Sequence, residues 1–319
     1  MTAAAAERHQ RLLRLGGERG VVAGIALDHR DSLRVVLESR GIDGLTDAHI
    51  RELKLRLARV LGPAATAIML DEEFGGPAID AGVVPASVGL IMPLEAQGYE
   101  TVMDGRATTR LEDFGPAEAL ARGAAACKLL LPYRVDHEPS SKRQDALLEA
   151  TVADCHAVGL PLVVEPLVFR DPIESPAWYA GAYRGLVVGA VARLQPLGAD
   201  LLKLPFPVLD LAEAGEAAAL DACRELDRAC AGTPWVLLGA GVATGTFLDQ
   251  VRLTGTAGAS GFLAGRGIWG AALVADPGEA ERLATTVCLP AFDRCRATAE
   301  RFARPLASSL DRLSGATGA

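Results

Sequence analysis

Two lysines and a glutamate lie in strongly apolar stretches of this sequence, and side chains of these types can form a site with a reactive amine. Lys203 lies within DLLKLP and Lys128 within ACKLL. A charged ammonium is costly in such surroundings unless it is paired or loses its proton, and a neighbouring cation makes that loss easier. A lysine kept partly neutral can attack a ketone and form a Schiff base, which withdraws electrons during carbon–carbon cleavage. Glu165, within VVEPL, can pair with either lysine and move a proton.

The elements that must position these residues are short apolar runs that alternate with longer amphipathic segments. This alternation is typical of parallel strands buried on both faces between helices. Eight such runs are rich in Val, Ile and Leu, and we expect strands at 21–27, 66–70, 88–92, 125–131, 161–165, 200–204, 235–239 and 261–264. We expect helices between them, among others at 48–61, 142–158, 177–194, 211–231 and 246–256.

Eight strands with intervening helices predict an α/β fold of the (β/α)8 or TIM barrel class. An open, doubly wound sheet is the alternative that periodicity leaves open, and the number of strands favours the barrel. No linker, charge block or internal repeat divides the 319 residues, so we predict one domain over 1–319. We expect it to carry an N-terminal helix at about 3–17 and a C-terminal helical extension at about 277–313.

Polar residues recur at the carboxyl ends of these runs, where barrel enzymes place their active sites. In chain order they are Asp28, His29 and Arg30, then Asp71, Glu72 and Glu73, then Glu95, Lys128, Glu165, Lys203 and Arg266. We therefore expect a charged mouth at this end of the barrel.

Each of these groups also has a purely structural interpretation. A lone lysine near a strand end can extend its ammonium to solvent, and Glu165 can form an inert ion pair. Asp28 can equally cap a helix. Two lysines on the strands that flank one carboxylate favour the catalytic interpretation, because buried charges are expensive without a function.

Glycine-rich turns after the seventh and eighth runs indicate a phosphate site. Gly239 and Gly241 follow the seventh run, and Gly265 and Arg266 follow the eighth. Barrel loops at these places often hold phosphate through backbone N–H groups, and arginine binds phosphate with two parallel hydrogen bonds. We expect no metal ion or other cofactor, because the five histidines show no paired spacing and the acidic run at 71–73 is more typical of a solvated loop.

Charge and composition narrow the range of partners. A formal net charge of −8 disfavours a nucleic-acid partner. We expect no contact with a membrane, because no uncharged apolar run reaches the length of about 18 residues that a spanning helix needs. The six cysteines form no C-x-x-C pair, which suits reduced thiols in a cytoplasmic protein. The C-terminal extension can serve a contact between copies, so we expect a homo-oligomer.

The ordered motifs of this chain resemble those of the class I tagatose 1,6-bisphosphate aldolases and their relatives, the sulfofructose-phosphate aldolases. The resemblance covers about 21–270, and the ordered set is far more specific than any single motif. The motifs are ALDHR at 26–30, MLDEEFGGPA at 69–78, PLEAQGYE at 93–100, CKLLLPY at 127–133, VEPL at 164–167, DLLK at 200–203, GAGV at 239–242 and AGRGIW at 264–269.

This resemblance implies a metal-independent aldolase that reversibly cleaves a phosphorylated ketose, or a sulfonated analogue, to dihydroxyacetone phosphate and an aldehyde. It implies that Lys203 forms the Schiff base, that Glu165 acts as acid and base, and that Lys128 assists. It also implies a set of substrate-binding residues, which are Asp28, His29, Arg30, Glu95, Gly239, Gly241, Gly265 and Arg266. Of these, Gly239, Gly265 and Arg266 are expected to hold the phosphate beside the ketone.

Three positions depart from the pattern of these relatives and leave other functions open. Relatives often carry glutamate at the position of Pro205, serine at that of Gly239 and glutamine at that of His29. Because the departures touch ligand-binding positions, a catalytically silent sugar-phosphate sensor is a second hypothesis. Another lysine-dependent barrel enzyme, such as a transaldolase or a deoxyribose-phosphate-type aldolase, is a third.

Overall fold

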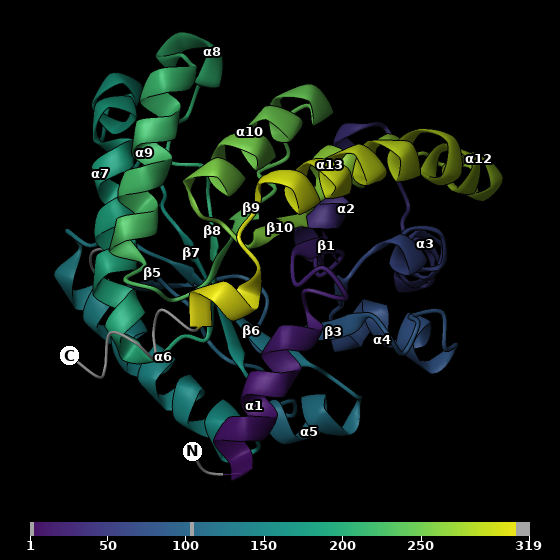
Figure 1. Cartoon of the computed structure of the whole chain (residues 1–319). Coiled ribbons are helices and arrows are strands. Elements are labelled where there is room, and N and C mark those ends of the chain that lie inside the picture. Colours follow the sequence, from purple (N-terminus) through teal and green to yellow (C-terminus); the bar gives the residue numbers. More distant parts are fainter. Residues whose placement is uncertain (1–2, 103–104, 311–319) are drawn as a thin grey trace.

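The computed structural model of the chain, described for residues 3–102 and 105–310, contains a closed barrel of eight parallel strands (Figure 1). The strands are hydrogen-bonded in the ring order β1-β10-β9-β8-β7-β6-β3-β2. Their bounds are β1 Val22–Ala26, β2 Ala67–Met69, β3 Gly89–Pro93, β6 Ala126–Pro132, β7 Leu162–Leu167, β8 Leu201–Leu204, β9 Trp235–Leu238 and β10 Gly261–Ala264. The predicted (β/α)8 barrel is confirmed, and each of the eight expected runs overlaps one strand of the ring.

Helices surround the barrel (Figure 1). Their bounds are α1 Ala3–Arg14, α2 Asp31–Ser39, α3 Asp47–Leu61, α4 Glu72–Asp80, α5 Pro116–Ala121, α6 Glu138–Ala157, α7 Pro176–Leu194, α8 Leu211–Ala214, α9 Glu216–Ala229, α10 Thr244–Ala257, α11 Arg266–Trp269, α12 Pro277–Leu283 and α13 Leu289–Phe302. The single helix expected over 211–231 is wrong, because Gly215 adopts a φ of 77° and separates α8 from α9. Within the described ranges, no helix has the length and apolar character needed to span a membrane.

The strands place alternate side chains inside the barrel. Ala126 of β6, Val163 of β7 and Leu201 of β8 belong to one buried cluster in the interior. The residues that follow each of them belong to a second cluster, which they share with the surrounding helices. Because side chains alternate between the two faces of a strand, the next inward position comes two residues further on, toward the carboxyl end. On these three strands those positions are Lys128, Glu165 and Lys203.

Residues from both ends of the chain close the amino-terminal end of the barrel. Leu12, Leu15 and Leu306 belong to the same buried cluster as the inward-facing strand residues. The N-terminal helix ends at Arg14, and the following residues form turns. In the C-terminal extension, α12 and α13 are joined by a π-helical turn at Ala284–Cys288, and residues 311–313 lie outside the described part of the chain.

A small hairpin follows β3 and has no counterpart among the expected elements. It consists of β4, Glu100–Val102, and β5, Gly105–Ala107, which pair antiparallel. Most of its residues are exposed or half-buried, so its sequence shows no apolar run. The segment that leads into this hairpin reaches the carboxyl end of the barrel, where it contributes to the cavity described next.

Candidate active site

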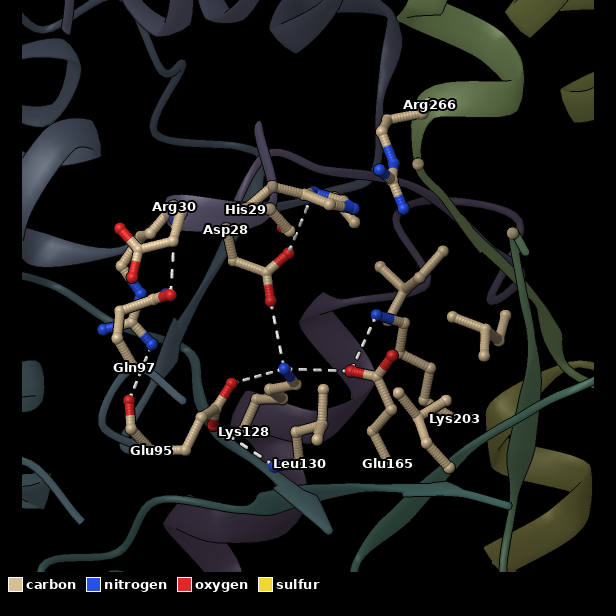
Figure 2. Close-up of a pocket in the computed structure, with 18 of the residues that line it drawn as sticks. Asp28, His29, Arg30, Glu95, Gln97, Lys128, Leu130, Glu165, Lys203 and Arg266 are labelled. Atoms are coloured by element: carbon tan, nitrogen blue, oxygen red, sulfur yellow. Dashed lines mark hydrogen bonds and ion pairs between the residues drawn. The ribbon is translucent and has the colours of Figure 1, made fainter. Parts of the chain in front are cut away.

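A cavity of about 580 Å³ opens at the carboxyl ends of the strands (Figure 2). Residues on or directly after β1, β3, β6, β7, β8, β9 and β10 line it. All but one of the predicted site residues are among them, namely Asp28, His29, Arg30, Glu95, Lys128, Glu165, Lys203, Gly239, Gly265 and Arg266. Gly241 is the exception, and it lies in the turn before α10 with a φ of 78°.

Lys128 lies at the centre of the charged residues, between three carboxylates (Figure 2). Its Nζ is 3.0 Å from Asp28 Oδ2, 2.5 Å from Glu95 Oε1 and 2.9 Å from Glu165 Oε2. Burial lowers the pKa of this lysine, but the three carboxylates outweigh burial and hold the pKa well above its usual value. Lys128 therefore keeps its positive charge.

Glu165 connects the two lysines. Its Oε2 lies 2.9 Å from Lys128 Nζ and 2.9 Å from Lys203 Nζ. Burial raises the pKa of Glu165, but the charges of Lys128 and Lys203 outweigh burial and hold it below the usual value. Among the described residues Lys203 has one ion-pair partner, whereas Lys128 has three. Lys203 is therefore held by fewer ionic contacts than Lys128.

Asp28 contacts Lys128 from the end of β1. Burial raises the pKa of its carboxyl group, and the charges of Lys128 and Lys203 lower it further than burial raises it, so Asp28 stays ionised. The helix-capping alternative for Asp28 is wrong, because α2 begins at Asp31 and Arg30 occupies its N-cap position.

His29 lies beside Asp28 at the wall of the cavity. Its Nδ1 is 3.8 Å from Asp28 Oδ1, and its ring packs edge-to-face on Trp269 with 5.3 Å between the centroids. Burial lowers the pKa of His29 to about 4, and the attraction of Asp28 only partly offsets this effect. The imidazole is therefore neutral at neutral pH.

Two arginines lie at different ends of the cavity (Figure 2). Arg30 is 4% exposed, and its Nη2 donates to the backbone oxygen of Glu95 at 2.7 Å. Arg266 is half-buried at the start of α11 and forms no ion pair with any carboxylate in the described ranges. Its guanidinium is directed toward the cavity in Figure 2. An arginine without an acidic partner at this position can bind an anionic ligand.

Beside Arg266, the backbones at Gly239 and Gly265 come into close contact. A Cβ atom at Gly239 would lie 2.8 Å from the backbone nitrogen of Gly265, so no side chain fits there unless the backbone shifts. A serine at this position would require such a shift. The loops after β9 and β10 thus present mainly backbone atoms and Arg266 to the cavity, and in barrels these two loops commonly bind phosphate.

The acidic residues after β2 do not join the cavity, so the expectation that this strand end contributes to the charged mouth is wrong. Asp71 is 1% exposed and pairs with Lys54, and its Oδ2 accepts a hydrogen bond from Phe74 N at 2.8 Å. Glu72 pairs with Arg122 at 2.9 Å. The acidic run at 71–73 is therefore not the solvated loop that we expected. Asp71 caps the start of α4 and forms a buried ion pair with Lys54.

Three residues that the sequence analysis did not identify lie close enough together to hold a metal ion, namely Asp136, His137 and Glu174. Both carboxylates are already engaged by Arg134, whose Nη2 lies 2.8 Å from Asp136 Oδ2 and 2.6 Å from Glu174 Oε1. None of these residues lines the cavity. We therefore assign no metal to them.

The cavity residues that were missed as candidates include two from the motif PLEAQGYE. Gln97 accepts a hydrogen bond from Asp31 N at 3.3 Å through its Oε1. Tyr99 packs its ring against the guanidinium of Arg106, with 5.9 Å from the ring centroid to Cζ. Both residues lie between β3 and the hairpin, so their contribution depends on how this irregular segment folds back over the barrel.

A barrel with a charged cavity at the carboxyl ends of its strands belongs to a class in which most members are enzymes. Over residues 23–271, the chain matches the DeoC/LacD family aldolase and belongs to this family. The protein is therefore an aldolase, a carbon–carbon lyase, and the family resemblance predicted from its motifs is confirmed.

The relatives it resembles include tagatose 1,6-diphosphate aldolases. The protein of that name from Listeria monocytogenes serotype 4a is 30% identical over 275 residues, which cover 81% of this chain and 80% of that protein. Tagatose 1,6-diphosphate aldolase 1 of Streptococcus mutans serotype c is 28% identical over 279 residues, covering 82% and 85%.

Solved structures of other aldolases share the fold. The fructose-bisphosphate aldolase from Plasmodium falciparum superimposes with a TM-score of 0.70 at 15% identity, covering 95% of this chain and 97% of that one. An archaeal fructose 1,6-bisphosphate aldolase superimposes with a TM-score of 0.59 at 20% identity, covering 89% and 98%. These similarities support the barrel fold.

Proposed function

We propose that this enzyme is a class I aldolase in which Lys203 forms a Schiff base with a ketose phosphate and releases dihydroxyacetone phosphate and an aldehyde. The observation that supports this most strongly is the single oxygen of Glu165 at 2.9 Å from both Lys203 Nζ and Lys128 Nζ. The names of the relatives favour a ketose like tagatose 1,6-bisphosphate. A ketose like 6-deoxy-6-sulfofructose 1-phosphate is the alternative.

Schiff-base formation begins when Lys203 gives a proton to Glu165 and its neutral amine attacks the C2 carbonyl carbon of the ketose. A proton moves from nitrogen to oxygen, which gives a neutral carbinolamine. Protonated Glu165 then donates its proton to the C2 hydroxyl, which leaves as water. The products are a cationic iminium on Lys203 and an ionised Glu165, so the charge of the pair is unchanged.

Cleavage uses the carboxylate that this step regenerates. Glu165 accepts the proton of the C4 hydroxyl, the C3–C4 bond breaks, and its electron pair moves into the iminium to give an enamine. The C4 fragment leaves as an aldehyde. Glu165 then gives this proton to C3 of the enamine, and hydrolysis of the resulting iminium by water releases dihydroxyacetone phosphate and returns Lys203 as the ammonium.

Lys128 acts by position and charge in this scheme. Its three carboxylate partners keep it protonated, so it does not compete with Lys203 as nucleophile. Its charge also favours the ionised form of Glu165, which is the form that accepts the C4 proton. We assign the phosphate beside the ketone to Arg266 and to the backbone at Gly239 and Gly265.

The decisive experiment is reduction with borohydride in the presence of dihydroxyacetone phosphate. Borohydride converts the iminium to a stable secondary amine, and peptide mass analysis then identifies the modified lysine. The chain has four lysines, Lys54, Lys128, Lys142 and Lys203, so the assignment is unambiguous. We expect the adduct on Lys203 and its complete loss in Lys203→Ala. Lys142→Ala is the matched control, because Lys142 lies exposed on α6.

A folded protein that gives no adduct on the Lys203 peptide would overturn this proposal. Ligand binding without turnover would support the sensor hypothesis instead. Without borohydride, transfer of a three-carbon unit from a ketose donor to an aldose acceptor would support a transaldolase.

We also propose that the enzyme is a cytoplasmic homo-oligomer whose whole chain folds as one domain. Its six cysteines are buried and unpaired, which suits a reducing compartment. Ile173 is 92% exposed and Trp178 is 49% exposed, and apolar side chains of this size suit a contact between copies. Light scattering on the purified protein measures the oligomeric state, and one cooperative unfolding transition is expected for one domain.

A further inference from the structure

His29 lines the cavity, and charged groups surround its imidazole ring. It lies between the Asp28 carboxylate and the Arg266 guanidinium, at the edge of the cavity (Figure 2). Trp269 packs against one side of the ring at 82° to its plane, which limits the orientations that the imidazole can adopt. The histidine side chain is 21% exposed, so a ligand in the cavity can reach it.

The two edges of the imidazole face different groups. Nδ1 is buried, has no hydrogen-bond partner in the described ranges, and has Asp28 Oδ1 at 3.8 Å. Cε1 and Nε2 lie 3.4 and 3.7 Å from the point where a Cβ atom of Gly265 would stand. The ring therefore spans the distance between a carboxylate and the glycine turn to which we assign the substrate phosphate.

The charged groups around His29 hold it neutral in the absence of ligand. Burial is the largest effect and lowers its pKa to about 4. Asp28 and Glu165 favour the protonated form, whereas Arg266 and Lys203 disfavour it. Neutral imidazole has a single N–H group, so it cannot donate to both neighbours at once. A doubly charged anion beside Gly265 would add a strong attraction for the protonated ring.

We propose that His29 takes up one proton when a dianionic phosphate group binds beside Gly265 and Arg266. The imidazolium then donates Nε2–H to a phosphate oxygen and directs Nδ1–H toward Asp28. This inference rests on the proposed function for the presence of a phosphate here, but it does not depend on the Schiff base. It makes His29 a specificity-determining residue that favours a dianion over an uncharged hydroxyl group.

The sign of the linkage follows from the direction of proton transfer. Because binding takes up a proton, the anion binds more tightly as the pH falls toward the pKa of the ligand-free histidine. A rise of two pKa units on binding makes the anion bind about tenfold more tightly near pH 5 than near pH 8. Glutamine at this position can donate a hydrogen bond but cannot contribute this pH dependence.

Nuclear magnetic resonance of the uniformly nitrogen-15-labelled protein, which reports both histidine rings and backbone amides, tests this inference directly. Sulfate is the probe, because it remains a dianion throughout the neutral and mildly acidic range and cannot form a Schiff base. The backbone amide of Gly265 reports sulfate binding, and His29→Gln assigns one of the five histidine signals. We expect saturating sulfate to raise the pKa of His29 by about one to two units and to leave the other four unchanged.

Two histidine variants then distinguish the pH dependence of sulfate binding that His29 causes from any general effect of pH on that binding. We expect His29→Gln to bind sulfate with little change in Kd between about pH 5 and pH 8, whereas His9→Gln on α1 keeps the wild-type dependence. An unchanged His29 pKa at saturating sulfate, or no shift of the Gly265 amide at any sulfate concentration, overturns the inference. Borohydride trapping reads the Schiff base independently, so a raised His29 pKa without trapping would overturn the aldolase mechanism alone.

Discussion

The barrel carries two buried lysine–carboxylate clusters, and only one of them lines the cavity. In the first, Asp71 follows β2 and pairs with Lys54 of α3, and each is 1% exposed. In the second, Lys128 of β6, Glu165 of β7 and Lys203 of β8 are 1%, 4% and 3% exposed. Burial of charge is therefore equal in the two clusters, and burial alone does not mark an active site.

The difference lies in how the carboxylate is used. Asp71 commits one oxygen to Lys54 and the other to the backbone N–H of Phe74, and the Lys54 ammonium lies 5.5 Å from the centre of the Phe74 ring. Neither Lys54 nor Asp71 lines the cavity. Glu165, by contrast, shares one oxygen between two ammonium groups at the wall of a cavity. Because this shared carboxylate has access to a ligand, we propose the second cluster as the reactive one.

The number of partners also separates the lysines electrostatically. Burial lowers the pKa of Lys54, and its single partner Asp71 does not fully offset this effect. Lys128 is just as buried, yet Glu165, Glu95 and Asp28 together raise its pKa well above the usual value. Three carboxylates overcome a desolvation penalty that one does not.

The largest effect on the reactive cluster is expected from Lys128→Met. Asp28, Glu95 and Glu165 would then face one another without their common cation, and removal of one partner from a buried charge group costs about 3–5 kcal/mol. We expect that loss in the free energy of unfolding, measured in urea near neutral pH, together with a fall in kcat of about a hundredfold or more. Lys142→Met, on the surface of α6, is the control and should change neither quantity.

The pH dependence of this variant identifies the cause. In the wild type, the pKa values of Asp28 and Glu165 are depressed, so their stabilisation is complete above the ordinary carboxyl range and is lost only as the pH falls through the folded-state pKa. Without Lys128, mutual repulsion raises these pKa values, and protonation relieves the strain. The stability gap between the two proteins should narrow from about pH 7 to pH 5. A constant gap would show that lost packing, rather than charge, causes the destabilisation.

Glu165→Gln should slow turnover without unfolding the protein. We expect kcat to fall by about a hundredfold, because glutamine cannot exchange the proton that Schiff-base formation and cleavage both require. Lys128 keeps Asp28 and Glu95 as partners, so the free energy of unfolding should change less than in Lys128→Met. Full activity in this variant would contradict the assigned role, and Glu138→Gln on the exposed start of α6 serves as the matched control.

The reactive cluster was predictable from sequence because its members stand out locally. Lys128, Glu165 and Lys203 are charged residues in runs that are otherwise apolar, and each follows an inward-facing core residue by two positions. Because side chains alternate between the two faces of a strand, all three point into the barrel, two positions closer to its carboxyl end than those core residues. The eight strands were recognisable for the same reason, since runs buried on both faces leave a continuous apolar signal.

The sequence did not show how the charges after β2 are used. Asp71 follows its strand as Asp28 does, but its partner Lys54 comes from α3, 17 positions earlier in the chain. That pairing depends on how the helix packs across the strand, and no local pattern records it. The hairpin Glu100–Ala107 was missed because its short, exposed strands carry no apolar run. The expected helix over 211–231 included Gly215, whose positive φ leaves no mark in the flanking residues.

The smallest effect is expected from replacing both members of the β2 pair, and this replacement tests the comparison most sharply. Lys54→Met alone leaves Asp71 as a buried unpaired charge and should lower the free energy of unfolding by about 3–5 kcal/mol. In Lys54→Met/Asp71→Asn, asparagine can still cap α4 and no charge is left unpaired, so the loss should shrink to about 1 kcal/mol. Turnover and borohydride trapping should match the wild type in both, because neither residue lines the cavity. Reduced kcat in the stable double variant would show that the two clusters are coupled, and the division between a structural and a reactive lysine would then fail.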